Sequence, residues 1–261
     1  MKYLKILNSY LRYRKNAVDA FGVHAPFLFN LLQEVVYQKS DNKEFVKIEN
    51  IRKSLLKNHS TIIVRDLGAG SRAENGRQRK IANIAKYSSK PPKYTALIYR
   101  IIKYLKPQTI LEIGTSFGIS TMYMAQANAQ ANIVTLEGCP ATAAIAQQNF
   151  DSLQMHNIKL IKGNFDETLP GYLNTNPILD FVFFDGNHRK EPTIRYFNQC
   201  IEKAHPDSVF VLDDIHWSEE MEAAWKLIQE DPRSQLCLDF YSFGIVFFKK
   251  EVSKESFVIR F

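Results

Sequence analysis

Three carboxylates follow short apolar runs in the second half of the chain. Asp185 comes directly after the run FVFF, and Asp213 and Asp214 follow the run VFVL. If the two runs are neighbouring parallel strands, their carboxyl ends face the crevice where open α/β sheets bind ligands. Carboxylate oxygens gathered at one point are the ligands that Mg²⁺ and Ca²⁺ prefer. The pattern therefore indicates a divalent-metal site. The alternative is that one aspartate caps the following helix and another binds water.

A second pattern combines an acidic residue with two glycines. In the segment TILEIGTSFGIS, Glu112 precedes Gly114 and Gly118, and a helical stretch over 119–127 follows directly. The next apolar run, NIVTLE, ends in Glu137, where an acidic residue can accept hydrogen bonds from ribose hydroxyls. A glycine turn alone would also fit NAD, but a carboxylate inside the strand end would repel a pyrophosphate. The spacing therefore predicts a cofactor that carries a cation and no phosphate.

Another glycine-bearing segment, IIVRDLGAGS, competes for the same role. It places Asp66 before Gly68 and Gly70, but a polar stretch follows, and no further strand is expected before residue 109. A ligand-binding turn needs a helix directly behind it, so that the first amides of the helix face the ligand. We therefore expect the 112–120 loop to bind the cofactor and the competing segment to be a surface turn.

The elements that would position these residues alternate regularly from residue 108 onward. The strand candidates are Thr109–Ile113, Asn132–Glu137, 158–161, 180–184, 208–212, 235–240 and 244–248. Intervals long enough for crossover helices separate the first five, which predicts right-handed βαβ units and a parallel sheet covered on both faces. Only three residues separate the last two, which predicts an antiparallel hairpin. The expected fold is α/β and doubly wound, with a mostly parallel seven-stranded sheet and an antiparallel C-terminal hairpin.

Residues 1–90 differ from the rest in pattern and charge. Apolar residues recur at helical spacing over residues 2–57. Residues 1–107 hold 22 Lys and Arg against 7 Asp and Glu, whereas residues 108–261 hold 12 against 20. We therefore expect a basic, mainly helical extension (1–90), serving as a cap or an oligomer contact, and a second domain (91–261). The basic charge fits a solvated surface, an anionic substrate, an acidic partner, nucleic acid or the acidic half itself.

The composition is that of a folded protein. Of the 261 residues, 45% are hydrophobic and 23% are charged, which excludes disordered, collagenous and coiled-coil chains. The longest apolar runs are too short for a membrane span, so no membrane association is expected. The three cysteines, Cys139, Cys200 and Cys237, show no CxxC spacing, which argues against a disulfide framework and against a zinc site. A reducing, cytoplasmic setting is expected.

From Glu112 onward the chain resembles the class I S-adenosylmethionine-dependent methyltransferases. Within them it is most similar to the metal-assisted O-methyltransferases of the catechol and caffeoyl-CoA type and to related sugar O-methyltransferases. The ordered segments that carry the resemblance are LEIGTSFGIST, VTLEGCP, LIKGNFDETLP, LDFVFFDGNH and VFVLDDIHW. The resemblance implies a Rossmann-like fold. The catechol and caffeoyl-CoA enzymes place Asn where this chain has Asp214, whereas sugar-modifying relatives can carry an acidic pair, so the substrate branch stays open.

The resemblance also implies roles for individual residues. S-adenosylmethionine is the implied cofactor, with Glu112 near its ammonium group and Glu137 at its ribose. The implied cofactor-binding residues are Glu112, Gly114, Ser116, Gly118, Ser120, Glu137, Gly138, Asn164, Phe165 and Asp185. The alternative for Phe165 is a core aromatic residue, and for Glu137 a solvated strand end.

The implied metal ligands are Asp185, Asp213 and Asp214, which would hold Mg²⁺ or another divalent cation. The implied catalytic residues are His188 and Asp185. With an ordinary pKa near 6.5, His188 would take the proton of the acceptor hydroxyl. The alternative is a histidine that caps the next helix.

We therefore expect an enzyme that transfers a methyl group from S-adenosylmethionine to a hydroxyl oxygen of a small molecule, with help from a divalent metal. One competing hypothesis is an RNA-binding protein or RNA methyltransferase that docks through the basic N-terminal half. Another is a non-catalytic cofactor-binding protein. Three acidic residues at the crevice and the lack of a known RNA-binding module argue against nucleic acid. A homodimer is a further expectation, and the sequence does not name the acceptor.

Overall fold

The computed structural model describes residues 2–23, 25–39, 41–65, 77–175, 178–250 and 253–261. These residues form two compact units. The continuous unit is Lys39–Thr175, and the split unit combines Met1–Gln38 with Asn176–Phe261. The bounds of the units differ from the division at residue 90 that the sequence suggests, and that division stays a prediction.

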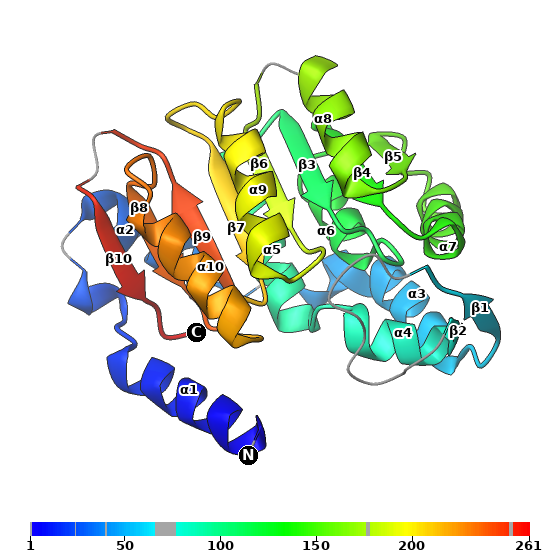
Figure 1. Cartoon of the computed structure of the whole chain (residues 1–261), viewed down its shortest axis with the longest axis horizontal. Helices are drawn as coiled ribbons and strands as arrows, with labels where there is room; N and C mark the ends of the chain where they lie inside the picture. Colours follow the sequence, from blue (N-terminus) through cyan, green and yellow to red (C-terminus); the bar gives the residue numbers. More distant parts are fainter. Residues whose placement is uncertain (1, 24, 40, 66–76, 176–177, 251–252) are drawn as a thin grey trace. The chain divides into compact units, whose positions relative to one another are not determined.

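The continuous unit contains three parallel strands with helices around them. Its elements are η3 (Asn42–Phe45), α3 (Val46–Lys57), β1 (Thr61–Ile63), β2 (Gln78–Lys80), α4 (Ile81–Ser88), α5 (Pro92–Leu105), β3 (Thr109–Ile113), α6 (Ile119–Ala127), β4 (Asn132–Glu137), α7 (Pro140–Ser152), β5 (Ile158–Lys162) and α8 (Phe165–Thr175). Strand β4 pairs in parallel with β3 on one side and with β5 on the other (Figure 1). The βαβ units expected from the spacing of the apolar runs are confirmed.

The apolar composition of these elements explains their burial. In β3, the side chains of Ile110, Leu111, Glu112 and Ile113 are all buried, as expected for a parallel strand covered on both faces. Helix α6 is buried over nearly its whole length. It belongs to a core cluster that includes residues of α3, α4, α5 and α7. The strand that carries the glycine loop, and the helix that follows it, are therefore held rigidly.

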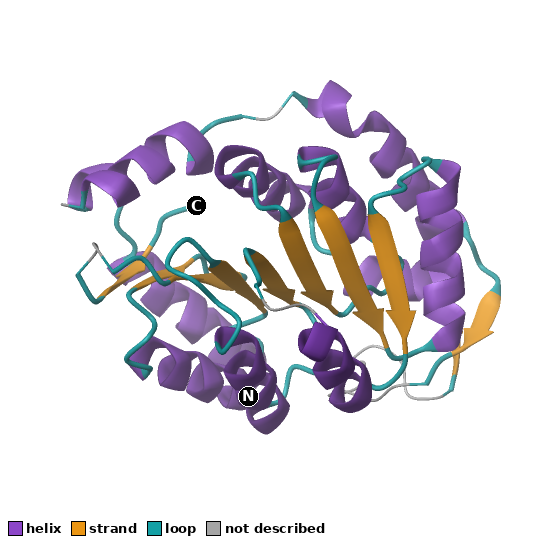
Figure 2. Ribbon diagram, turned by 90° about the horizontal axis from the view of Figure 1, so that it is seen from above, coloured by secondary structure: helices purple, strands orange, loops and turns teal. Residues whose placement is uncertain are grey.

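The split unit contains the strands that carry the other candidate residues. Its elements are α1 (Lys2–Asn16), η1 (Ala20–Gly22), α2 (Pro26–Leu31), η2 (Leu32–Val36), β6 (Phe181–Phe184), α9 (Lys190–Ile201), β7 (Val209–Asp213), α10 (Glu219–Glu230), β8 (Leu236–Asp239), β9 (Phe243–Phe247) and β10 (Glu255–Val258). Strands β6 and β7 are parallel, and β9 pairs antiparallel with both β7 and β8. The expected C-terminal hairpin is confirmed. Helices lie on both sides of the strands (Figure 2).

Two strands, β2 and β10, were not expected. Strand β2 pairs antiparallel with β1 in the stretch before residue 109 where no strand was predicted, because QRK carries no apolar run. Strand β10 pairs in parallel with β8, and its side chains are exposed or half-buried. The pairing makes β6, β7, β8 and β10 run in one direction. Their carboxyl ends therefore meet at one edge of the split unit, which we call the carboxyl edge. Asp185 and Asp213 lie at this edge, as does Tyr241 in the turn between β8 and β9.

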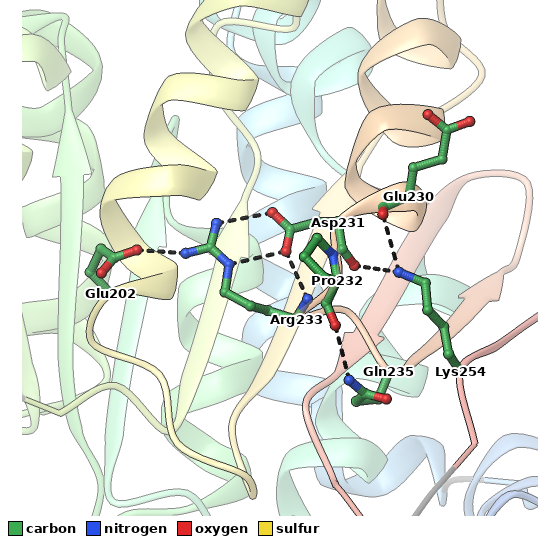
Figure 3. A network of polar contacts seen from close by, with 7 residues as sticks. All are labelled: Glu202, Glu230, Asp231, Pro232, Arg233, Gln235 and Lys254. Atoms are coloured by element: carbon green, nitrogen blue, oxygen red, sulfur yellow. Dashed lines mark hydrogen bonds and ion pairs between the residues drawn. The ribbon is translucent and has the colours of Figure 1, made fainter.

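A polar network holds the turn between α10 and β8 (Figure 3). Arg233 pairs with Asp231 at 2.9 Å and with Glu202 at 2.5 Å. Lys254, next to β10, donates to the carbonyl oxygens of Glu230 and Asp231 at 3.1 and 2.6 Å. Because Arg233 and Glu202 are both largely exposed, their ion pair contributes little to stability. The network joins the turn between α10 and β8 to Lys254, which precedes β10.

Gly244 in β9 lies against the indole of Trp225 in α10. A Cβ atom at position 244 would come within 2.5 Å of the ring atom Cη2 of Trp225, a side chain that is only 4% exposed. Gly244→Ala is therefore expected to lower the free energy of unfolding by about 1–3 kcal/mol, the usual cost of overpacking. Urea unfolding followed by circular dichroism measures this change. Gly171→Ala, whose added Cβ would meet nothing within 4 Å, is the control. Equal stabilities of the two variants would contradict the prediction.

Candidate active site

The glycine loop of the continuous unit is tied to the end of the neighbouring strand by Glu137. The backbone N–H of Ser116 donates to one oxygen of this carboxylate at 2.8 Å, and the N–H of Cys139 donates to the other at 2.8 Å. Burial raises the pKa of Glu137, although both amides act to lower it. Glu137 is thus held in one orientation at the carboxyl end of β4, and it is not a loosely solvated strand end. Its remaining lone pairs can accept two hydroxyl groups.

Glu112 is fully buried inside the end of β3. One carboxyl oxygen accepts hydrogen bonds from the hydroxyls of Thr121 and Thr135. The other, Oε1, has no hydrogen-bond partner among the described residues. Burial is the main cause that raises the pKa of Glu112 to about 8, and the negative charge of Glu137 adds to it. The carboxyl group is therefore mostly protonated at neutral pH, and a nearby cation would favour its ionised form.

Two glycines of the loop adopt backbone angles that other residues rarely adopt. Gly114 has a φ of 109° and Gly118 a φ of 78°. A Cβ at Gly118 would lie 2.3 Å from the ring of Phe150 in α7. Ser116 also has a positive φ, of 50°. The backbone conformation of the loop thus requires glycine at positions 114 and 118. Ser120 is buried in the first turn of α6, the helix that follows the loop.

The remaining cofactor candidates of the continuous unit lie at the ends of β4 and β5. Gly138 follows Glu137 and is half-buried. Asn164 precedes α8, and its side-chain oxygen accepts a hydrogen bond from the N–H of Asp166 at 3.2 Å. Phe165, the first residue of α8, is half-buried. Contact of Asn164 and Phe165 with an adenine ring stays a prediction.

In the split unit, two of the predicted metal ligands are neighbours. Phe184 of β6 pairs with Leu212 of β7, so Asp185 and Asp213 follow at adjacent positions. Asp213 is 4% exposed, and its Oδ1 accepts a hydrogen bond from the N–H of Asp214 at 2.8 Å. Asp214 has a φ of 56°. Among the residues that the structure describes, no three His, Cys, Asp or Glu side chains are placed to hold a metal ion. Metal binding by Asp185, Asp213 and Asp214 stays a prediction.

His188 lies next to Asp185. Its Nε2 is 3.7 Å from Asp185 Oδ1, and both side chains are largely buried. The residue that caps α9 is Arg189, so His188 is not the helix cap. Asn187 and His188 both have positive φ values, 70° and 42°. This strained turn carries the imidazole to the carboxyl edge, where its centroid lies 6.2 Å from that of Trp217.

Several residues that shape the site were not singled out from the sequence. Thr121 and Thr135 donate hydrogen bonds to Glu112. A threonine inside an otherwise apolar helix or strand was the sequence feature that could have revealed each of them. Ser88, at the end of α4, lies 2.8 Å from Ser116 of the glycine loop, oxygen to oxygen. Cys139 accepts a hydrogen bond from the N–H of Arg65. The competing glycine segment, with Asp66, Gly68 and Gly70, lies outside the described residues.

Several known proteins that are similar to this chain are methyltransferases. Residues 111–215 match the family described as "Methyltransferase domain". A catechol O-methyltransferase of Niastella koreensis is 28% identical over 127 residues, which are 48% of this chain and 57% of that protein. An O-methyltransferase of Bacillus cereus, solved with S-adenosylhomocysteine, superposes with a TM-score of 0.56 at 17% identity, over 84% of this chain and 96% of that one. A putative caffeoyl-CoA O-methyltransferase of Staphylococcus aureus gives 0.57 at 18% identity, over 64% and 88%.

Residues 111–215 are thus similar to a methyltransferase domain, and the chain shares its fold with solved O-methyltransferases. In sequence it is similar to a catechol O-methyltransferase. The chain spans little more than half the length of the Niastella relative. Across the described part of the chain, no helix is both long enough and apolar enough to cross a membrane.

Proposed function

We propose that the chain transfers a methyl group from S-adenosylmethionine to a hydroxyl oxygen of a small acceptor. The observation that carries the proposal is a pair of carboxyl groups beside the glycine loop: the orphaned oxygen of Glu112, just before the loop, and the fixed carboxylate of Glu137, at the end of the neighbouring strand. An unpaired oxygen in a fully buried carboxyl group is costly unless a ligand satisfies it. A cationic cofactor with ribose hydroxyls matches both groups.

The residues of the continuous unit would bind and orient the cofactor. Glu112 would face its ammonium group, Glu137 would accept its ribose hydroxyls, and Asn164 and Phe165 would lie at its adenine. When bound, S-adenosylmethionine supplies a methyl group made electrophilic by the adjacent sulfonium. The rigid burial of β3 and α6 supports this assignment, because alignment of the reacting groups is the main contribution a protein makes to such a transfer.

The residues of the split unit would act on the acceptor. His188 Nε2 would take the proton of the acceptor hydroxyl, and Asp185 at 3.7 Å would stabilise the imidazolium that results. The strained turn at Asn187 and His188 supports the proposal, because such backbone strain clusters at functional sites. A small-molecule acceptor, a homodimer and a cytoplasmic setting belong to the same proposal.

Binding of cofactor tests this proposal directly. Isothermal titration with S-adenosylhomocysteine is expected to give saturable one-to-one binding, which Glu137→Ala should weaken at least tenfold, about 1.4 kcal/mol. Glu167→Ala removes an exposed carboxylate of α8 and is the matched control. Incubation with methyl-labelled S-adenosylmethionine and a panel of phenols, catechols and sugars then tests transfer. Absence of cofactor binding would refute the proposal, and binding without any transfer would favour a non-catalytic protein.

The proposal also includes a divalent metal ion that would assist methyl transfer. The adjacent strand ends that carry Asp185 and Asp213 support it, and Asp214 would have to turn toward them. We expect Mg²⁺ or Mn²⁺ to raise the thermal melting temperature of the wild-type chain, and Asp213→Ala to remove the increase without changing cofactor affinity. Asp151→Ala, at an exposed position of α7, is the control. An identical metal-dependent increase in Asp213→Ala would rule out this site.

A further inference from the structure

Helix α1 is fixed to the rest of the split unit by one of its faces. Ser9 donates to Oε1 of Glu222, in α10, at 3.0 Å. Tyr13 donates to the carbonyl oxygen of Ile259 at 2.5 Å, and its ring lies 5.2 Å from that of Tyr241, centroid to centroid. All of these residues belong to the split unit. One face of α1 is therefore held in place by polar and aromatic contacts.

The opposite face of α1 carries two exposed leucines. Leu7 and Leu11 are four positions apart, so they lie on the same face of the helix, and Ser9 and Tyr13 share a face for the same reason. Each residue of an α-helix adds about 100° of rotation, so two positions turn the second pair about 200° from the first. Leu7 is 51% exposed and Leu11 is 55% exposed, whereas Tyr13 is 6% exposed. The contacts of α1 thus hold an apolar ridge, formed by Leu7 and Leu11, toward solvent.

Positive charge accompanies this leucine ridge. The segment KYLKILNSYLRYRKN, which forms α1, has five Lys and Arg and no Asp or Glu. Arg14 and Lys15 follow Leu11 by three and four positions and are exposed, so they continue the face of the ridge by one turn. Their aliphatic stems can lie along an apolar surface while the charged ends contact anionic groups. The outward face of α1 therefore combines apolar side chains with cations.

The charge and the shape of this face indicate its partner. A second copy that met it face to face would bring together two helices that each have five cations and no acid, and these would repel. A protein groove that takes up a helix contacts a longer row of anchors than two leucines. A bilayer surface is flat and accepts apolar side chains at its head groups, and anionic lipid attracts basic segments. An anionic bilayer surface therefore matches both the ridge and the charge.

We propose that α1 binds to the surface of an anionic lipid bilayer. Leu7 and Leu11 enter the head-group region, while Arg14 and Lys15 contact the lipid phosphates. Such a helix lies on the membrane and needs none of the long apolar runs that a membrane span requires. The expectation of no membrane association rested on the lack of such runs, which does not bear on surface binding. The proposal concerns binding alone and is independent of the proposed methyl transfer.

Co-sedimentation of the full chain with lipid vesicles tests the proposal. The chain is expected to bind vesicles of phosphatidylcholine with about 30% phosphatidylglycerol at least fivefold more tightly than vesicles of phosphatidylcholine alone. Raising NaCl from about 50 mM to about 500 mM should weaken this binding, because salt screens exposed charges. The double variant Leu7→Asn, Leu11→Asn should bind the anionic vesicles at least fivefold more weakly than the wild type. The double variant Arg14→Gln, Lys15→Gln should lose most of the preference for anionic lipid, and it serves as the test if the asparagine variant does not fold.

Leu227→Asn is the matched control, because Leu227 is 44% exposed in the same unit but lies on α10, whose first turn is acidic. This variant should bind vesicles like the wild type. The proposal is overturned if the wild type does not bind anionic vesicles, or if the double variant Leu7→Asn, Leu11→Asn binds them as tightly as the wild type. Sedimentation velocity without lipid tests the competing partner, a second copy of the chain. A wild type that self-associates through the ridge, together with a monomeric leucine double variant, would assign the ridge to a dimer interface and also overturn the proposal.

Discussion

Gly118→Val is expected to abolish measurable binding of S-adenosylhomocysteine and to lower the free energy of unfolding by about 2 kcal/mol or more. The backbone of Gly118 has a φ of 78°, which a β-branched residue adopts only at considerable cost. The added Cβ would also lie 2.3 Å from the ring of Phe150, which is 1% exposed and has no room to move. Relief of the clash must displace the start of α6, and the amides that face the proposed cofactor move with it.

Titration calorimetry and urea unfolding measure the two effects in Gly118→Val. Gly118→Ala, with a smaller side chain, covers the case in which the valine variant does not fold. Gly171→Ala in α8 is the matched control, because its Cβ would meet nothing within 4 Å. It should bind cofactor like the wild type and be as stable or more stable by about 0.5–1 kcal/mol. Unchanged affinity in a folded Gly118→Val chain would show that the 112–120 loop is not the cofactor loop.

Glu112→Gln is expected to stabilise the chain at high pH and to weaken cofactor binding at least tenfold, about 1.4 kcal/mol. The pKa of Glu112 in the folded chain is about 8, above its ordinary value of 4.5. The folded chain thus holds a proton that the unfolded chain has released, so stability falls as the pH rises from 4.5 through about 8. A neutral amide avoids this loss, but it cannot balance the charge of a cationic ligand.

Thermal melting between pH 5 and pH 9 measures the stability effect. The difference in melting temperature between Glu112→Gln and wild type should be small at pH 5 and should grow in favour of the variant toward pH 9. Calorimetry in buffers of different ionisation enthalpy should show that wild-type cofactor binding at pH 7 releases protons. Glu167→Gln, at an exposed position of α8, should behave as wild type in both experiments. A constant difference across this pH range would refute the assignment of Glu112.

The alternation of strands and helices was predictable because parallel strands buried on both faces appear as continuous apolar runs. Strands β3 and β4 have the predicted bounds, and β5 to β9 differ from prediction by one or two residues. Strand β10 was missed because ESFV is short and partly exposed, so it lacks the continuous apolar run by which the other strands were recognised. The course of α1 was not predictable either. It depends on contacts with residues more than 200 positions away.

In the candidate site, too, the features set by local sequence were predictable, whereas those set by tertiary contacts were not. The positions of Glu112, Gly118 and Glu137 followed from spacing along the chain, because strand ends and glycine turns are local features. The orphaned oxygen of Glu112 and the clash that would arise at Gly118 depend on side chains from other elements. The neighbouring positions of Asp185 and Asp213 were expected from the order of strands, but the orientation of Asp214 depends on its own backbone angle.

The split unit has a consequence for the order in which the chain folds during translation. Arg260 donates to the carbonyl oxygen of Ala17 across 243 positions, and the ring of Phe27 packs on that of Phe247. Residues 1–38 leave the ribosome first but cannot reach these partners until the last strands have been made. The contacts of the continuous unit join residues that are closer in sequence, so this unit can form before the last strands are made. The apolar faces of the first helices therefore stay uncovered through most of synthesis, the interval in which chaperones and aggregation compete for such surfaces.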